Sequence, residues 1–435
     1  MKDIHVIKIN IGSPTPQQTE LRKESARLWN RLVKLHKYNR KRHWKWLGKF
    51  DLSTHFKGRF DLHSQSIQAL CEKLSANVDT TRTNRKNGDH KARYPWRCKK
   101  NFQVCIWKQA AIKVNGNRIS LSNGRGRKPL RFKLPRTMPM GKIVQAELGF
   151  RELRLTISNE IDKPSSAGLN TVAADVGIIH TAVMTDGVKS LGIVGRGMRS
   201  LTQGKNRKLA FYTQALAKCK KGSRKSRKLR IAKAKMLNRY ENRTHNLLHH
   251  VANQMLDFCV GRDAGTLVVG DIANIAKGKK KKHAKRSNQE NSGSPIGRLY
   301  DYLRYKGQLR GVEIVKINEA YTSQSCPLCD HRHKPSGRNY KCTNKECDFV
   351  GIRDNVGAAN ILNKHYNGKI VAGTLLPPNN VKYLRPVKLR QSVVDPLNKG
   401  KLLSTTHTKV TVPLGAGSKI RCDYDTGFDL ETHTL

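Results

Sequence analysis

Acidic residues are scarce in this chain of 435 residues. Aspartate and glutamate together number 31 against 85 lysines and arginines, so the formal net charge at pH 7 is +54. A compact chain with such an excess of one sign repels itself unless a polyanion neutralises it. Nucleic acid is the polyanion that extended basic surfaces most commonly bind. The scarcity of acids therefore predicts a nucleic-acid-binding protein.

Long apolar segments are also missing. The sequence has no run of about 18 apolar residues, the length that a helix needs to cross a bilayer. The N-terminal stretch MKDIHVIKIN lacks the apolar core of a signal peptide. We therefore expect no membrane partner and a cytoplasmic, nucleoid-associated location of the bacterial type.

Cysteine is sparse, and its placement is uneven. Of the ten cysteines, four lie within residues 326–347 and the others are scattered, which argues against a disulfide framework. Two close pairs, separated by a loop of twelve residues, make up the cluster: Cys326 with Cys329, and Cys342 with Cys347. Four thiolates at such spacings predict one tetrahedral zinc ion with no open position, hence a structural site.

Two histidines lie inside the same loop. His331 and His333 could each replace a cysteine as a zinc ligand. A solvated position is the more common one for histidines of a basic loop. The four cysteines therefore remain the predicted ligand set.

The first 165 residues combine short strands with helical segments. Alternating apolar and polar residues predict a strand at 4–10, and an apolar stripe in a basic, tryptophan-bearing segment predicts one or two helices at 17–47. Another helix is predicted at 61–80, followed by five short apolar segments with turn residues between them. We expect an antiparallel β-barrel or sandwich over residues 1–165, with a helical insertion at about 17–80.

The pattern changes at Thr171, where three short strands follow one another. A helical region at 203–260, interrupted near its middle, leads to the nearly apolar strand TLVVGDI, which is typical of a parallel sheet. A helix at about 295–310, a strand at 312–318 and a last helix after the cysteines complete the order. This order favours an α/β fold of the ribonuclease-H-like kind, interrupted by the cysteine module.

Two segments have no clear periodicity. Residues 276–295 are basic and of low complexity, which predicts a mobile loop. Residues 373–435 are rich in Pro, Gly, Ser, Thr and Asn, which predicts a disordered tail.

Acids at the ends of strands are candidate ligands for catalytic metal ions. Nucleases of this fold class hold two ions between carboxylates, and the ions stabilise the attacking and leaving oxygens of a phosphodiester. Asp175 lies in an apolar strand, where an acid is rarely a core filler, although a turn-forming role at the strand end is the alternative. Asp354 opens the last helix, where it could cap the helix, bind a metal ion or do both. Magnesium suits such oxygen ligands.

The strand that should supply a further acid carries Gly270 instead. Asp271 follows, but in a strand its side chain would point to the opposite face. The strand at 312–318 should lie parallel to it, about 4.8 Å away, so Glu319 could reach the space that the glycine leaves free. We therefore predict that Glu319 completes the catalytic magnesium site with the two aspartates. The alternative is a solvent-facing acid before the zinc module.

Several stretches resemble the TnpB proteins of bacterial insertion sequences, relatives of the type V CRISPR effectors and of Fanzor. The resemblance covers about residues 1–370 and is carried by ADVGIIHTAVMTDG, VVGDIANI, EAYTSQSCPLCD and YKCTNKECDFVGIRDNVGAANIL. It implies an RNA-guided DNA endonuclease, encoded by a transposable element, with a RuvC domain that cleaves with Mg²⁺. The implied partners are a guide RNA, the target double-stranded DNA and its displaced single strand.

The resemblance also implies a domain plan. Residues 1–165 would be a wedge β-barrel with a recognition insert, and 170–320 with 351–372 would be the RuvC-like domain. Residues 321–350 would be a zinc-ribbon module that binds target nucleic acid. The first and third RuvC acids fall on Asp175 and Asp354, and some branches carry their glutamate where Glu319 stands.

Two other functions fit part of the pattern. A nuclease-inactive, RNA-guided DNA-binding repressor would share the charge and the zinc module. A zinc-ribbon RNA-binding protein without a guide would explain the charge but not an acid within the apolar strand of Asp175. The presence of acids at both expected positions favours the nuclease.

Overall fold

A computed structural model describes most of the chain up to residue 386. The residues that it does not describe are 1, 97, 100, 125, 137, 140, 163, 272–288, 290–292 and 387–435. Most of the predicted basic loop at 276–295 and the tail beyond 386 lie outside the described residues. No helix of the described part is both long and apolar enough to cross a membrane.

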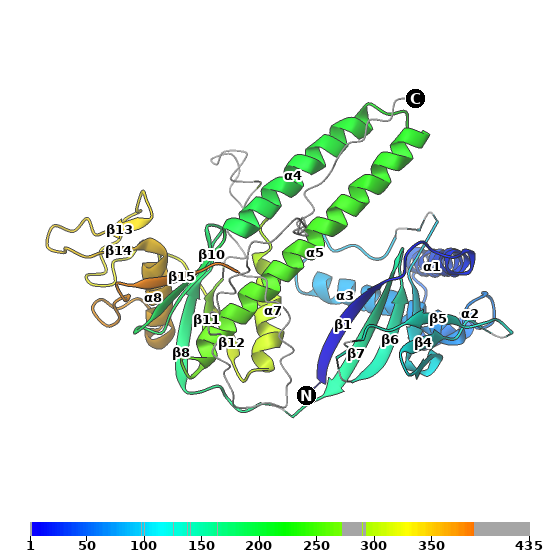
Figure 1. Cartoon of the computed structure of the whole chain (residues 1–435), viewed down its shortest axis with the longest axis horizontal. Helices are drawn as coiled ribbons and strands as arrows, with labels where there is room; N and C mark the ends of the chain where they lie inside the picture. The colour runs from blue at the N-terminus through cyan, green and yellow to red at the C-terminus, as the bar shows by residue number, and fades with distance from the viewer. Residues whose placement is uncertain are drawn as a thin grey trace, which may run out of the picture. The chain divides into compact units, whose positions relative to one another are not determined.

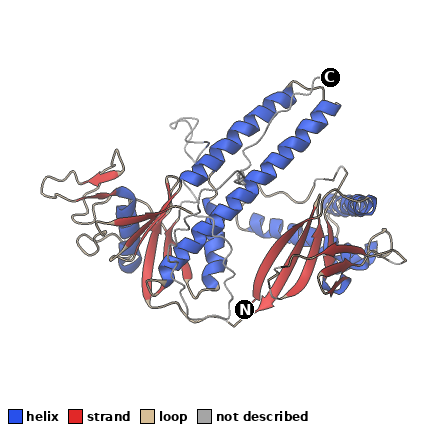
Figure 2. Ribbon diagram, in the orientation of Figure 1, coloured by secondary structure: helices blue, strands red, loops and turns tan. Residues whose placement is uncertain are grey.

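The N-terminal half contains a four-stranded antiparallel sheet and three helices (Figures 1 and 2). The strand order is β1-β7-β6-β2. Alternate residues of one strand, Leu153, Leu155 and Ile157, are fully buried, which is the period expected of a sheet with one covered face. The bounds are β1 (Lys2–Asn10), α1 (Pro16–Lys41), α2 (Lys49–Phe56), α3 (Ser64–Lys86), β2 (Cys105–Lys108), β6 (Lys142–Leu148) and β7 (Glu152–Glu160).

The predicted strands are present, but a closed barrel is not confirmed. In the described residues the other three strands form a second antiparallel sheet in the order β3-β4-β5. A short 3-10 turn at Gln109–Ala111 follows β2 and redirects the chain before the second sheet begins. The bounds are β3 (Ile112–Asn115), β4 (Arg118–Leu121) and β5 (Leu130–Lys133).

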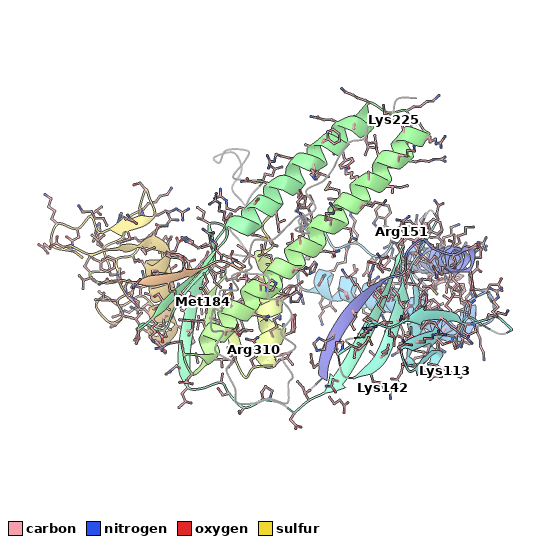
Figure 3. The ribbon with its side chains drawn as sticks, in the orientation of Figure 1. Lys113, Lys142, Arg151, Met184, Lys225 and Arg310 are labelled. Atoms are coloured by element: carbon pink, nitrogen blue, oxygen red, sulfur yellow. The ribbon has the colours of Figure 1, made fainter. Side chains whose placement is uncertain are left out.

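The second half is built on a six-stranded mixed sheet of order β12-β11-β8-β9-β10-β15, with Met184 inside it (Figure 3). The first three strands form the predicted antiparallel meander. The nearly apolar strand pairs in parallel on both sides, as its composition predicts. The bounds are β8 (Asn170–Asp175), β9 (His180–Thr185), β10 (Ser190–Val194), β11 (Ala264–Gly270), β12 (Glu313–Ile317) and β15 (Val381–Leu384).

Helices cover both faces of this sheet. On one face, Leu267 and Val269 of β11 belong to a core shared with α5 and α7, whereas Val268 packs with Ile361 of α8 on the other face. Because side chains alternate along a strand, Gly270 faces α8. The predicted helical region is a hairpin of two helices, and its first helix begins earlier than expected, at Arg196. The bounds are α4 (Arg196–Ala217), α5 (Arg224–Val260), α7 (Ile296–Gln308) and α8 (Arg353–Asn367).

The cysteine module connects β12 to α8 and contains little regular structure (Figure 2). Its hairpin consists of β13 (Asn339–Lys341) and β14 (Val350–Ile352). The fully buried Asn360 of α8 donates hydrogen bonds of 2.8 Å to the carbonyls of Thr322 and of Ser325. This amide fastens the entrance of the module to the helix at the sheet.

The prediction of a disordered tail from residue 373 is wrong for its first part. Residues 381–384 form β15, which pairs in parallel with β10. The ring of Tyr383 lies where a side chain on Gly192 would be, since an ideal Cβ there would overlap the ring. Asn355 and Asn363 of α8 donate hydrogen bonds to the carbonyls of Pro378 and Val371. These tertiary contacts order a segment whose local pattern is weak.

Candidate active site and metal centre

Asp175 lies at the end of β8, on the face that α8 covers. An ideal Cβ at Gly357 of α8 would come within 2.6 Å of Oδ2 of Asp175, so the helix can pack here only because it carries a glycine. Burial, together with the charges of Asp354 and Glu319, raises the pKa of Asp175 to about 8, against the opposing effect of Arg353. Such a carboxyl group is poised to exchange its proton for a cation.

Glu319 follows β12 and reaches across to β11. An ideal Cβ at Gly270 would lie 2.5 Å from Oε2 of Glu319 and 3.1 Å from its Cβ. The glutamate therefore occupies the space beside the glycine, on the same face as Asp175. Burial and the nearby charge of Asp271 raise the pKa of Glu319 to about 7.

Asp354 lies in the first turn of α8 but does not cap it. The N-cap position is Ile352, so the capping interpretation is wrong. The Nδ1–H of His180 in β9 donates a hydrogen bond of 2.6 Å to Oδ2 of Asp354, and the imidazole lies against the ring of Tyr383. The sequence alone did not predict His180 as a site residue, because Asp354 lies far away in the chain. The position of His180 shortly after Asp175 is the signal that could have identified it.

Asp271 belongs to the opposite face, as its position predicts. Its carboxylate lies 3.9 Å from the ammonium of Lys316, which in turn sits 3.8 Å from the ring centroid of Tyr300 in α7. The side chain of Asp271 thus lies beside Lys316 and α7, but Asp271 lines the same cavity as Asp175, Glu319 and Asp354.

The three predicted acids line one cavity of about 800 Å³. Apolar residues of α7, such as Leu299 and Leu303, form part of its wall, and Arg338 of the cysteine module and Arg353 add positive charge. The cavity thus combines a carboxylate centre with basic and apolar walls. Such a combination suits a phosphodiester with its sugar and base.

The ligand atoms of Asp175, Glu319 and Asp354 do not all lie within 4.8 Å of one another. Among the described residues, only the four cysteines bring three or more ligand atoms within 4.8 Å of one another. Two cations about 4 Å apart need ligands on both flanks and between them, so a wider arrangement of acids fits a pair of ions. Carboxylate oxygens such as those of these three acids are the donors that magnesium prefers.

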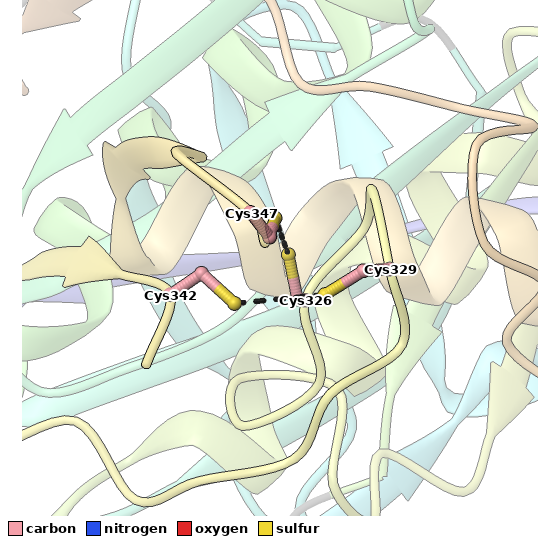
Figure 4. A group of neighbouring side chains, drawn as sticks. All are labelled: Cys326, Cys329, Cys342 and Cys347. Atoms are coloured by element: carbon pink, nitrogen blue, oxygen red, sulfur yellow. Dashed lines mark hydrogen bonds between the residues drawn. The ribbon is translucent and has the colours of Figure 1, made fainter. Parts of the chain in front are cut away.

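The four cysteine sulfurs point toward one another from two loops of the module (Figure 4). The Sγ atoms of Cys326 and Cys347 are 3.7 Å apart, and those of Cys329 and Cys342 are 3.6 Å apart. Tetrahedral zinc with bonds of about 2.3 Å places its sulfurs about 3.8 Å apart, so the set fits zinc.

The two histidines of the loop have other contacts. Nε2 of His331 lies 2.9 Å from Oγ1 of Thr343, and Nδ1 of His333 lies 3.3 Å from the hydroxyl of Tyr340. The four cysteines therefore remain the candidate ligand set.

Comparison with known proteins identifies the same region. A family model described as the Cas12f1-like TNB domain matches residues 297–361, from α7 through the cysteine module into α8. A TnpB-like protein of Methanocaldococcus jannaschii is 28% identical over 149 residues, which cover 33% of this chain and 51% of the relative. The chain is therefore similar to TnpB-like and Cas12f-like proteins. A CRISPR-associated endodeoxyribonuclease, Cas12f2 of a Micrarchaeota archaeon, is 33% identical over 86 residues, 18% of this chain and 16% of that protein.

The fold of this TnpB/Cas12f-like chain also has a solved counterpart. The structure of a Cas12f1–sgRNA–target DNA complex superposes with a TM-score of 0.55 at 16% identity, covering 79% of this chain and 81% of that one. At this identity the likeness shows a shared fold. The chain spans about half the length of the TnpB-like relative and less of the Cas12f2 relative.

Proposed function

We propose that this chain is an RNA-guided DNA endonuclease, encoded by a transposable element, that hydrolyses phosphodiesters with two Mg²⁺ ions. Asp175, Glu319 and Asp354 would be the ligands of these ions. The observation that carries the proposal is the convergence of these acids, from three separate elements, on one cavity beside the cysteine module. Glu319 supports it further, because its carboxylate fills the place beside Gly270 where the sheet lacks an acid.

The roles of the residues follow from their positions. Two bound ions would polarise the phosphate and stabilise the attacking and leaving oxygens. Asp175 interacts with both other acids, so it suits the position between the ions. The hydrogen bond from His180 restrains one oxygen of Asp354. Arg338 and Arg353 would hold the backbone of the DNA strand by its phosphates.

The partners follow from charge and family. A chain with a net charge of +54 can neutralise many phosphates, and the related Cas12f1 has been solved with an sgRNA and target DNA. Base pairing between the guide RNA and the target strand would recognise the target sequence, while the protein would recognise a short motif beside it. We propose residues 1–165 as the wedge with its recognition insert, 170–320 with 351–372 as the nuclease domain, and 321–350 as the target-binding module.

The test begins with the RNA that copurifies with the full-length protein. Sequencing this RNA defines the guide, and a duplex that carries the matching target behind a library of adjacent sequences then serves as substrate. We expect cleavage with Mg²⁺ and a matched guide, and none with EDTA or a mismatched guide. Guided binding without cleavage by the wild-type protein would instead indicate the nuclease-inactive repressor. DNA binding that is independent of any RNA would refute the guide mechanism.

A further inference from the structure

Arg22 is a buried arginine on α1, far in sequence from the proposed nuclease centre. Its side chain is only 8% exposed, although arginine is rarely buried without a partner. The guanidinium carbon lies 4.9 Å from the ring centroid of Phe102 and 5.6 Å from that of Phe150. The charged group is thus framed by two phenyl rings.

No carboxylate in the described residues neutralises this guanidinium. The acids nearest to it along α1 are engaged elsewhere: Glu20 pairs with Lys23, and Glu24 pairs with Arg27. The Nε atom of Arg22 is buried without a hydrogen-bond partner, and burial lowers the pKa of the group. A buried, unpaired cation is unfavourable, and contact with aromatic faces offsets only part of that cost.

The two rings do not belong to a closed core. The side chain of Phe102 is 40% exposed and that of Phe150 is 57% exposed. Arg151, at the turn between β6 and β7, places its guanidinium 5.4 Å from the ring centroid of Phe150 (Figure 3). Hence the surface over Arg22 presents aromatic faces and a second cation to solvent.

The backbone holds these groups in place. The amide of Gln103 donates a hydrogen bond of 3.0 Å to the carbonyl of Arg22, which ties the segment of Phe102 to α1. The amide of Ile11 donates one of 3.0 Å to the carbonyl of Arg151. A preformed arrangement of this kind binds a ligand with little loss of conformational freedom.

We propose that Arg22, Phe102, Phe150 and Arg151, the aromatic–arginine site, bind one nucleotide of single-stranded RNA. The phosphate would accept hydrogen bonds from Arg22 and Arg151, and the base would stack on an exposed phenyl ring. A phosphate would supply the negatively charged partner that the guanidinium of Arg22 lacks. The flat apolar rings of Phe102 and Phe150 can stack on a base, whereas they offer a free anion no favourable contact. This inference rests on the proposed binding of a guide RNA.

The cost of the unpaired cation favours RNA over DNA. Target DNA would occupy the site only during a reaction, and the charge would be unpaired at all other times. A guide RNA that stays bound would neutralise Arg22 throughout the life of the folded protein. The site therefore fits the permanent partner.

The experiment compares Arg22→Met with Arg131→Met in the full-length protein. Methionine keeps much of the length of arginine and removes the charge, and Arg131 is an exposed arginine of β5 that serves as the matched control. Binding of the copurified RNA, of DNA of the same sequence and of inorganic phosphate is measured with each protein after the bound RNA has been removed. Thermal unfolding is recorded with and without RNA.

We expect Arg22→Met to weaken RNA binding about tenfold, the loss of one charge-assisted contact. The loss should clearly exceed that of the control, and DNA binding should change less than RNA binding. Without RNA the variant should unfold at the same or a higher temperature than the wild type, because an unpaired buried charge is gone. A purely structural arginine would lower that temperature instead.

Several results would overturn the inference. These are equal losses in the two variants, equal effects on RNA and DNA, or stabilisation of the wild-type protein by phosphate as large as that by RNA. Phe150→Ala gives an independent check, since the ring is largely exposed: it should weaken RNA binding, and unchanged binding would also count against the site. If the wild-type protein binds RNA and the variants bind equally well, only this site is refuted. If the wild-type protein binds no RNA, the proposed function itself fails.

Discussion

An ideal Cβ atom on Gly270 would lie 2.5 Å from the carboxylate oxygen Oε2 of Glu319. Gly270 ends β11 and Glu319 follows the neighbouring strand β12, and only one of them can place a side chain in that space. The proposed nuclease centre therefore carries its glutamate just after β12 rather than at the end of β11.

Glu319→Gln should abolish Mg²⁺-dependent cleavage and leave the binding of RNA and target nearly intact. Glutamine keeps the shape of the side chain but removes one of the three charges that the ions need. Asp271→Asn is the comparison, because Asp271 lines the same cavity but its carboxylate lies beside Lys316, so its loss should lower cleavage much less. Cleavage rates and binding constants of both variants are measured with one guide and target. Full cleavage by Glu319→Gln would refute the role of Glu319.

A swap of the two positions tests whether they share one volume. Gly270→Glu alone should lower cleavage strongly, since its Cβ would crowd Glu319 and would lie 3.2 Å from Cδ1 of Ile361. Gly270→Glu combined with Glu319→Gly should recover part of the activity, and recover more than Gly270→Glu with Glu319→Gln, which still fills the space. The measurement is the cleavage rate of Gly270→Glu and of the two double variants, compared under the same conditions. Equal rates in the two double variants would contradict the shared volume.

The stability of the magnesium-free protein should depend on pH through Asp175. Its pKa in the folded chain is about 8, above the ordinary value of 3.8, so the folded state holds this proton more tightly than the unfolded state. The free energy of unfolding should therefore fall as the pH rises between these two values. Asp175→Asn should reduce this decline, leaving the part that the raised pKa of Glu319 contributes, and should be more stable than the wild type at pH 8.

Urea unfolding at several pH values, in magnesium-free buffer that retains zinc, measures this effect. Added Mg²⁺ should restore the stability of the wild type at pH 8 but should have little effect on Asp175→Asn. Parallel pH profiles for the two proteins would show that Asp175 is not the group responsible.

Cys342→Ser should release about one zinc ion per chain and lower the unfolding temperature, because the bound metal replaces a core in the small module. Cys98→Ser is the control, since Cys98 is exposed and lies outside the module. Elemental analysis of the purified proteins measures zinc, and thermal unfolding measures stability. A wild-type protein without zinc would rule out the site.

His180→Phe should lower the cleavage rate by about 10- to 100-fold, the usual effect of losing a group that orients a metal ligand. Phenylalanine can keep the contact with Tyr383 but cannot donate to Asp354. His180→Asn retains an N–H donor at a similar distance from the backbone and should recover part of the rate. The measurements are the cleavage rate and the Mg²⁺ concentration for half-maximal activity. A purely structural histidine would show no such rescue and no change in Mg²⁺ requirement.

The sequence by itself determined the features that depend on near neighbours. The four cysteines lie within 22 residues, so their spacing alone predicts the ligand set that their sulfurs form. Alternation, apolar segments and turn residues predicted strands in both halves, and an acid in an apolar strand marked Asp175 as a candidate site residue. A parallel sheet also brings the ends of neighbouring strands together, so the closeness of Glu319 to Gly270 followed from pattern plus a known fold.

Only the tertiary structure decided the contacts between distant segments. The hydrogen bond between His180 and Asp354 joins residues 174 positions apart, and no local pattern specifies it. The strand at 381–384 forms because β10 offers a free edge and Gly192 leaves room for Tyr383, not because of its own composition. The two sheets of the first half and the unpaired charge of Arg22 are likewise results of packing. Propensity acts over a few residues, whereas edges, cavities and buried charges exist only once the whole chain has folded.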